Sequence, residues 1–423
     1  MGQPNLTGLF KRLKAELFDH GFLDTLAKNT GVIKRLRKIS GSDLLDTLLF
    51  DSNQSFNGMS MQLMLRHSLN ISKQALHQKY NEGLTEFIKG ALERLLAIEL
   101  PCREIQGLEI NIKDSTRFAL PEAMADVYPG TKGCGIKAGA ALQFEFGIKS
   151  GSCDIRLTPG NCNDQKESHL DQQMIRPGVL YMRDLGYSHI AYMSNIIEKK
   201  AFFVNKLSPK TSIHILRNEV YQELDLTALQ KSGKAFDGLV YIGKDELPVR
   251  MIIEPVSDEI KNNRISHTDK YNKKKGHQTT ALFKLRAGFN FIVTNLDSTY
   301  SAELIRKLYH LRWQIELVFK GWKSSLKIHQ MPKGNTHRIT CALYSKLLWA
   351  MLSWKITMSI GKIGEVSILK VHSFIASGMQ ELRLQLWGLS SKWLDMLEQL
   401  PFYKLLKEQK KGRLKTEEIV III

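Results

Sequence analysis

The chain has 423 residues, a length that predicts two or three domains. Its 60 Lys and Arg against 42 Asp and Glu give a formal net charge of +18, which favours a nucleic-acid partner over an anionic membrane surface. The five cysteines are scattered without a CxxC pair, which argues against a disulfide framework or a zinc site and favours a reducing cytosol. Neither a secretory signal nor an apolar run of about 18 residues is present, so we expect no membrane span.

Residues 1–105 are predicted to be helical, because Leu and Ile recur at three- and four-residue steps. Within them, Met61, Met64 and Leu65 lie on one predicted helix, and Ser72 is a plausible N-cap of the next. This is the length pattern of a helix-turn-helix, whose second helix would enter a DNA major groove. That second helix would present Lys73, Gln74, His77, Gln78 and Lys79, with Ala75 and Leu76 buried. An ordinary helical hairpin fits the same pattern.

Strands are predicted from about residue 107 onward. LEINIKDSTRF reads as a strand ending in Asp114, and GVLYMRDLGY as a strand ending in Asp184. Segments 138–150 and 152–160 form two further strands joined by a tight turn, and 166–178 is helix-like. Strands together with later helices favour an α/β fold around one mixed sheet. Both aspartates are expected at strand ends, where sheet folds usually place their sites.

The region 208–288 is predicted to be rich in strands and to contain a basic loop, KNNRISHTDKYNKKKGHQ, at residues 261–278. The lysines of this loop (Lys270, Lys273, Lys274 and Lys275) could contact a DNA backbone, although a solvated loop explains them equally well. GFNFIVTNL then reads as a strand. One long helix is expected after Ser301, and helical patterns continue to about residue 408.

The long helix carries a narrow polar stripe. Four side chains fall within about 60° of arc beside the apolar face: Tyr309, Arg312, Glu316 and Lys323. Glu316, joined by Asp114 and Asp184, would supply the oxygen ligands that Mg²⁺ or Mn²⁺ requires, and two such ions promote in-line displacement at a phosphodiester. Arg312 and Lys323 would hold phosphates. The competing interpretation is an intrahelical Arg312–Glu316 ion pair, with the aspartates acting only as turn formers.

The spacing Tyr309-x2-Arg312-x3-Glu316-x6-Lys323 resembles the Y-x2-R-x3-E-x6-K signature of bacterial insertion-sequence transposases of the DDE superfamily. IVTNL before this segment, RWQIE with Trp313, and FKGWKSSLK after it are similar too. KDST around Asp114 and RDLGY around Asp184 resemble the blocks that hold the first two acidic residues of the family. The resemblance covers about residues 107–330.

The resemblance implies a catalytic and metal-binding triad of Asp114, Asp184 and Glu316 that uses Mg²⁺ or Mn²⁺. It implies DNA contacts by Tyr309, Arg312, Trp313 and Lys323, in addition to those predicted for Lys73, Gln74 and Gln78. It further implies an RNase H-like α/β core with a β-rich insertion, an all-helical DNA-binding domain before it and helices after it. The expected boundaries are 1–105, 106–207, 208–288, 289–330 and 331–423, of which the second and fourth form the core.

By the same resemblance, the partners are double-stranded DNA (the terminal inverted repeats of the element and a target) and a second copy of the chain on DNA. The expected location is the bacterial cytoplasm, at the nucleoid. Two alternatives use the same features: a non-catalytic DNA-binding regulator derived from a transposase, and a nuclease that cuts without joining. A glycosidase with paired carboxylates fits poorly with the charge of +18. The apolar end, EEIVIII, matches no part of the signature.

Overall fold

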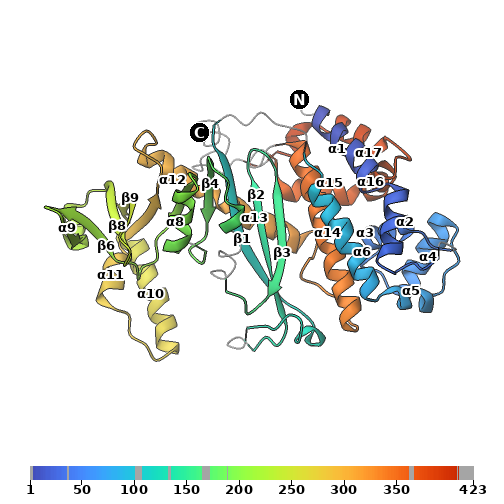
Figure 1. Ribbon diagram of the computed structural model, residues 1–423, viewed down its shortest axis with the longest axis horizontal. Coiled ribbons are helices and arrows are strands. Elements are labelled where there is room, and N and C mark those ends of the chain that lie inside the picture. The colour runs from blue at the N-terminus through green and yellow to red at the C-terminus, as the bar shows by residue number, and fades with distance from the viewer. Residues whose placement is uncertain are drawn as a thin grey trace. The chain divides into compact units, whose positions relative to one another are not determined.

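The computed structural model describes residues 3–35, 38–100, 107–131, 135–163, 172–187, 189–361, 366–406 and 408 (Figure 1). The chain forms two compact units. The first comprises Met1–Ile105, Ser115–Cys162 and Gln314–Val420, and the second Gln106–Asp114, Asn163–Trp313 and Ile421–Ile423. The EEIVIII end and residues 166–171 of the predicted helix-like segment 166–178 lie outside the described residues. The remainder of that segment contains only the short 3₁₀ helix Gln172–Met174.

The predicted N-terminal helices are present. They are α1 (Gln3–Glu16), α2 (His20–Asn29), α3 (Gly41–Phe50), α4 (Phe56–His67), α5 (Lys73–Lys79) and α6 (Glu82–Ala97). The C-terminal helices of the same unit are α13 (Trp313–Ser324), α14 (Thr336–Ile360), α15 (Ile368–Ser377), α16 (Met379–Leu386) and α17 (Lys392–Gln399). Helix α6 packs along α14, as Figure 1 shows. The helices of residues 1–105 therefore share a core with helices more than 200 residues later in the sequence.

Buried polar contacts join these helices. Asp46 of α3 is 1% exposed and accepts hydrogen bonds from Arg383 Nε and Trp387 Nε1, each at 2.7 Å. His67 Nε2 of α4 lies 3.1 Å from the same carboxylate. Lys355 of α14, also buried, donates to the carbonyl oxygens that end α6. Within the described part of the chain, no helix combines the length and apolar character needed to cross a membrane.

The expected mixed α/β sheet is confirmed. Ten strands follow the order β3-β2-β1-β4-β5-β10-β9-β8-β6-β7. The first five are β1 (Glu109–Ala119), β2 (Gly139–Gly147), β3 (Cys153–Pro159), β4 (Val179–Arg183) and β5 (Phe202–Lys206). Strands β1, β4 and β5 are parallel, whereas β2 and β3 form an antiparallel hairpin. Strand β1 continues to Ala119, so the prediction that it ends at Asp114 is wrong. Only its pairing with β4 stops there.

The 208–288 region extends the sheet of the second unit. Its strands are β6 (Ile213–Arg217), β7 (Val220–Glu223), β8 (Phe236–Ile242) and β9 (Leu247–Pro255), and β10 (Phe289–Thr294) connects them to β5. Helices α9 (Leu226–Ser232), α10 (Asp258–Lys274) and α11 (Ala281–Arg286) lie between the strands in sequence, whereas α8 (Ile190–Glu198) precedes β5.

The predicted basic loop is wrong, because most of it is the 17-residue helix α10. Ser257 caps this helix, Asp258 and Glu259 stand in its first turn, and Lys273 and Lys274 stand in its last turn. These charges complement the helix dipole. No residue of α10 is buried, so the sequence lacks the apolar period by which helices are recognised.

Asp46 provides a test of this packing. Burial alone would raise the pKa of Asp46, but hydrogen bonds from His67, Arg383 and Trp387 outweigh it and hold the pKa below its usual value. Asp46→Ala leaves the buried guanidinium of Arg383 without its carboxylate, and we expect it to lower the free energy of unfolding by about 3–5 kcal/mol. Urea denaturation of the full chain at pH 7 measures this loss.

As a control, Glu86→Ala removes an exposed ion pair with Lys89 and should cost less than about 1 kcal/mol. Because the pKa of Asp46 is depressed on folding, its stabilising effect is present above the ordinary aspartate pKa and is lost as the pH falls through the lower value. The difference between wild type and Asp46→Ala should therefore shrink below about pH 4. Equal losses for the two variants at pH 7 would contradict this assignment.

Candidate active site

Two carboxylates lie side by side at the edge of the parallel strands of the second unit. The register of β1 and β4 places Lys113 opposite Arg183, and Asp114 and Asp184 are the next residues on each strand. Their side chains are 17% and 48% exposed, respectively. Parallel strands bring their carboxyl ends to one sheet edge, so the pairing of two buried strands fixes this arrangement.

Arg312 connects the two carboxylates. Its Nη1 lies 3.4 Å from Asp114 Oδ2 and 3.9 Å from Asp184 Oδ1, and its side chain is 15% exposed. Tyr309 lies beside it, with the ring centroid 6.0 Å from Arg312 Cζ. Burial raises the pKa of Tyr309 to about 12, an effect that Asp184 increases and Arg312 opposes. The phenol is therefore neutral near pH 7 and able to donate a hydrogen bond.

The single long helix predicted after Ser301 is wrong. The structure has two helices, α12 (Ala302–Leu311) and α13, with Arg312 between them. The Arg312 N–H donates to the Tyr309 carbonyl three residues earlier, a tighter turn than that of an α-helix. Tyr309 and Arg312 consequently belong to the second unit, whereas Glu316 and Lys323 belong to the first.

Helix α12 is fixed to the sheet of its own unit by two arginines. Arg306 pairs with Glu254 of β9 at 2.9 Å. Arg250, also on β9, pairs with Asp237 at 2.7 Å and donates to backbone carbonyls of residues 297 and 300, just before α12. Both contacts hold α12 and thereby the side chains of Tyr309 and Arg312.

Helix α13 is anchored in the first unit by aromatic packing. The ring of Phe144 on β2 lies 4.7 Å from that of Trp322 and 5.2 Å from that of Trp354 on α14, between ring centroids. Glu316 stands in the first turn of α13 and is half-buried. Trp313 is 52% exposed. Such a helix offers a carboxylate and an exposed indole on a rigid support.

Lys323 is partly buried and makes a hydrogen bond within the first unit. Its Nζ donates to the Arg117 carbonyl on the later half of β1 at 3.3 Å, and burial lowers its pKa.

The structure therefore brings together Asp114, Asp184, Tyr309 and Arg312. Among the described residues, no group of three or more His, Cys, Asp or Glu side chains is arranged to hold a metal ion. The Asp114–Asp184 pair nevertheless fits a hard divalent cation, because it presents carboxylate oxygens at a partly exposed strand edge. The triad with Glu316 stays a prediction.

The expected pair of helices α4 and α5 is present in the first unit. Ser72 caps α5 by accepting a hydrogen bond from the Ala75 N–H, and Leu76 is buried as predicted. Lys73, Gln74, His77 and Gln78 are exposed. Ala75 is exposed as well, contrary to the prediction, because a helix of seven residues buries only one narrow side. Lys79 donates to the Val32 carbonyl at 2.7 Å and has a structural contact.

Lys206 was not identified from the sequence. It ends β5, whose parallel pairing with β4 places it at the same strand edge as Asp184. Its Nζ lies 5.4 Å from the Tyr309 ring centroid. The sequence AFFVNKL predicts a strand after the one that ends at Asp184, which was the available indication. Only the register of the parallel pair, however, places Lys206 beside the carboxylates.

Paired carboxylates bridged by arginine at the edge of a mixed sheet, in a strongly basic chain, are typical of enzymes that act on the phosphodiesters of nucleic acid. A family model described as "Transposase DDE domain" matches residues 106–352, more than half of the chain. The chain belongs to this DDE transposase family, and its sheet is consistent with the RNase H-like core expected for it.

Curated relatives support the same family. The chain is 29% identical over 359 residues to the transposase for insertion sequence element IS231B of Bacillus thuringiensis subsp. berliner, covering 77% of this chain and 75% of the relative. It is 28% identical over 407 residues to the transposase for insertion sequence element IS1151 of Clostridium perfringens, covering 86% and 85%.

The position of Arg312 leads to a prediction about cation binding. Because its guanidinium competes with a metal ion for the two carboxylates, we expect Arg312→Gln to strengthen Mn²⁺ binding about two- to fivefold in the absence of DNA. Isothermal titration calorimetry measures the affinity. Arg306→Gln, on the same helix but paired with Glu254, is the matched control and should leave it unchanged. Identical affinities for both variants would mean that Arg312 does not compete at this site.

Proposed function

We propose that this chain is the transposase of a bacterial insertion sequence, which cleaves DNA at the ends of the element and joins the freed 3′ ends to target DNA. The observation that carries the proposal is the Asp114–Asp184 pair bridged by Arg312, located within the segment that matches the transposase family. Both reactions are phosphoryl transfers, so one site serves them.

In this proposal Asp114, Asp184 and Glu316 hold Mg²⁺ or Mn²⁺, which activates the attacking oxygen and stabilises the leaving oxygen when bound. Arg312 binds the scissile or a neighbouring phosphate through its planar fork once the carboxylates no longer occupy it. Tyr309, neutral near pH 7, donates a hydrogen bond to a phosphate oxygen. Exposed Trp313 stacks on a base or sugar, and Lys323 adds a point charge near the end of α13.

Recognition of the element ends is assigned to the N-terminal helices. The exposed side chains of α5 support a helix-turn-helix, with Lys73 on a phosphate and Gln74 and Gln78 reading base edges. Joining two ends to one target requires at least two copies of the site. We therefore infer that a homodimer assembles on DNA, in the cytoplasm at the bacterial nucleoid.

The decisive experiment concerns Glu316. Purified wild type and Glu316→Gln are incubated with Mg²⁺ or Mn²⁺ and DNA carrying the inverted repeats that flank the gene. We expect the variant to lose cleavage by at least about a thousandfold, as for removal of an essential group in phosphoryl transfer. Its binding to the same ends should stay within a few-fold.

The matched control is Glu303→Gln, which removes a carboxylate of α12 that pairs with Lys307 and should cut normally. Cutting by Glu316→Gln would reject the triad. Cutting by wild type without joining to a second duplex would favour a nuclease, and tight end binding without any cutting would favour a regulator.

The recognition helix is tested separately. Gln74→Ala should reduce the preference for element ends over unrelated DNA by about 1–3 kcal/mol, because it removes a base-edge contact. Lys73→Ala should weaken binding to all sequences and lower the salt slope by about one ion. Fluorescence anisotropy over a salt series measures both quantities. Lys11→Ala, an exposed lysine of α1, controls for general charge loss. If Gln74→Ala keeps the wild-type preference for element ends over unrelated DNA, α4 and α5 form an ordinary helical hairpin and not a recognition motif.

A further inference from the structure

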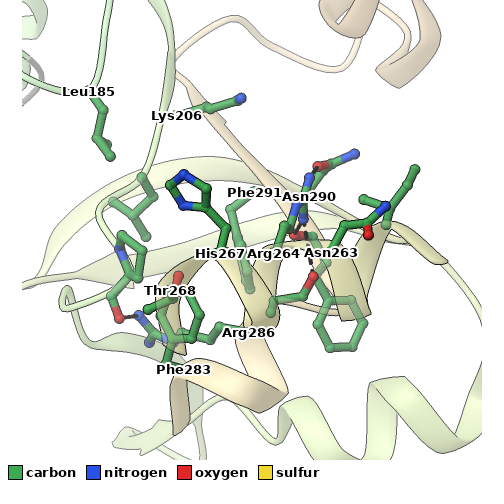
Figure 2. A pocket seen from close by; sticks show the side chains of 15 residues that line it. Leu185, Lys206, Asn263, Arg264, His267, Thr268, Phe283, Arg286, Asn290 and Phe291 are labelled. Carbon is green, nitrogen blue, oxygen red and sulfur yellow. Dashed lines mark hydrogen bonds between the residues drawn. The ribbon is translucent and has the colours of Figure 1, made fainter. Parts of the chain in front are cut away.

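A cavity of about 600 Å³ lies in the second unit next to the carboxylate pair (Figure 2). Helices α10 and α11 and the strands β5 and β10 supply most of its lining. Leu185, the neighbour of Asp184 in sequence, and Lys206 belong to this lining. Figure 2 shows the His267 ring projecting from α10 toward both of them. Leu185 and Lys206 therefore place one side of the cavity next to the candidate active site.

Three cationic side chains belong to the lining, namely Lys206, Arg264 and Arg286. His267 adds an imidazole, and none of the described lining residues is acidic. The guanidinium of Arg264 donates to two backbone carbonyls, at 2.9 and 3.1 Å, and to the Asn290 side-chain oxygen at 2.6 Å. All three acceptors are neutral. Desolvation, followed by the charges of Arg312 and Arg264, lowers the pKa of Lys206, and Asp184 partly opposes this effect. The positive charges near Lys206 therefore repel one another, a repulsion that a bound anion would reduce.

Arg286 is the most unusual member of the lining. It is only 6% exposed, and its terminal nitrogens donate to the carbonyls of Pro209 and Thr211. Its Nε has no hydrogen-bond acceptor among the described residues. Burial lowers the pKa of Arg286, and Glu223, which is outside the lining, only partly opposes this. A buried guanidinium without a carboxylate costs free energy that a bound anion would offset.

The remaining wall is mostly apolar and includes the rings of Phe283 and Phe291, with Asn263, Thr268 and Asn290 as its neutral polar members. Cavities of a few hundred Å³ with aromatic walls and few polar groups suit molecules of nucleotide size. A phosphate fits the cations, and a base or sugar fits the rings.

We propose that this cavity binds a phosphate-bearing nucleotide, namely one from a DNA strand that continues past the carboxylate pair, with Lys206 at its entrance and Arg286 at its wall. This inference rests on the proposed function for the identity of the strand. A free mononucleotide carries the same phosphate and base as a nucleotide within a DNA strand. The relative affinities of a trinucleotide and a mononucleotide distinguish these two ligands.

The test measures binding without metal, in EDTA, so that no cleavage is involved. The probes are a 5′-phosphorylated thymidine trinucleotide and thymidine 5′-monophosphate, titrated into the full-length protein by calorimetry. His267→Glu places a negative charge among the lining residues, whereas Lys270→Glu makes a charge change outside the lining on the same exposed helix. We expect about a tenfold loss of trinucleotide affinity for His267→Glu and less than about threefold for Lys270→Glu.

Trinucleotide binding stronger than that of the monophosphate supports a DNA strand as the source, and equal binding of both supports a free nucleotide. No measurable binding of either probe, or equal losses in the two variants, overturns the proposal. Lys206→Glu provides a second variant at the entrance, with the same expected loss. Cleavage of element ends by wild type reports on the proposed function independently. Normal cleavage together with equal losses in the two variants would overturn the cavity assignment alone.

Discussion

The parallel pairing of β1 with β4 is the constraint on which the candidate site depends. It aligns Lys113 with Arg183, both almost fully buried, and so places Asp114 and Asp184 next to each other. A shift of one residue in this register would turn one aspartate to the opposite face of the sheet. Two adjacent carboxylates repel each other, and Arg312 provides the compensating charge. Arg312 thus keeps the two carboxylates close together, in a position where their oxygens could bind a divalent cation.

The segment from Tyr309 to Lys323 lies on two helices with separate supports. Helix α12 is held to its sheet through Arg306 and Glu254, and α13 is held by the packing of Phe144 on Trp322. Arg312 stands between the two helices, two residues before Gln314, where the chain enters the first unit. Tyr309 on α12 and Glu316 on α13 are therefore held by different anchors, although only seven positions separate them in the sequence.

Much of the fold was predictable because its elements bury regular apolar patterns. Examples are the strands β4, β5 and β10 and the N-terminal helices. The sequence also indicated Asp114, Asp184 and Arg312 as candidate site residues. Helix α10 was missed because it buries no residue, and the break at Arg312 was missed because both sides of it are helical. Lys206 was missed for a different reason: its place beside Asp184 depends on strand pairing between distant segments, which periodicity within one segment does not contain.

The net charge of +18 is larger than the charge accessible to DNA, because some of the cations are buried inside the fold. Lys346 and Lys355 of α14 are buried, and each donates a hydrogen bond to at least one backbone carbonyl. Arg383 neutralises the buried Asp46. Such cations stabilise the helical unit and are not available to a polyanion. Exposed lysines, such as Lys73 of α5 and Lys270 of α10, remain accessible. Because only accessible charge releases counterions from DNA, the exposed cations rather than the total should determine how strongly binding depends on salt.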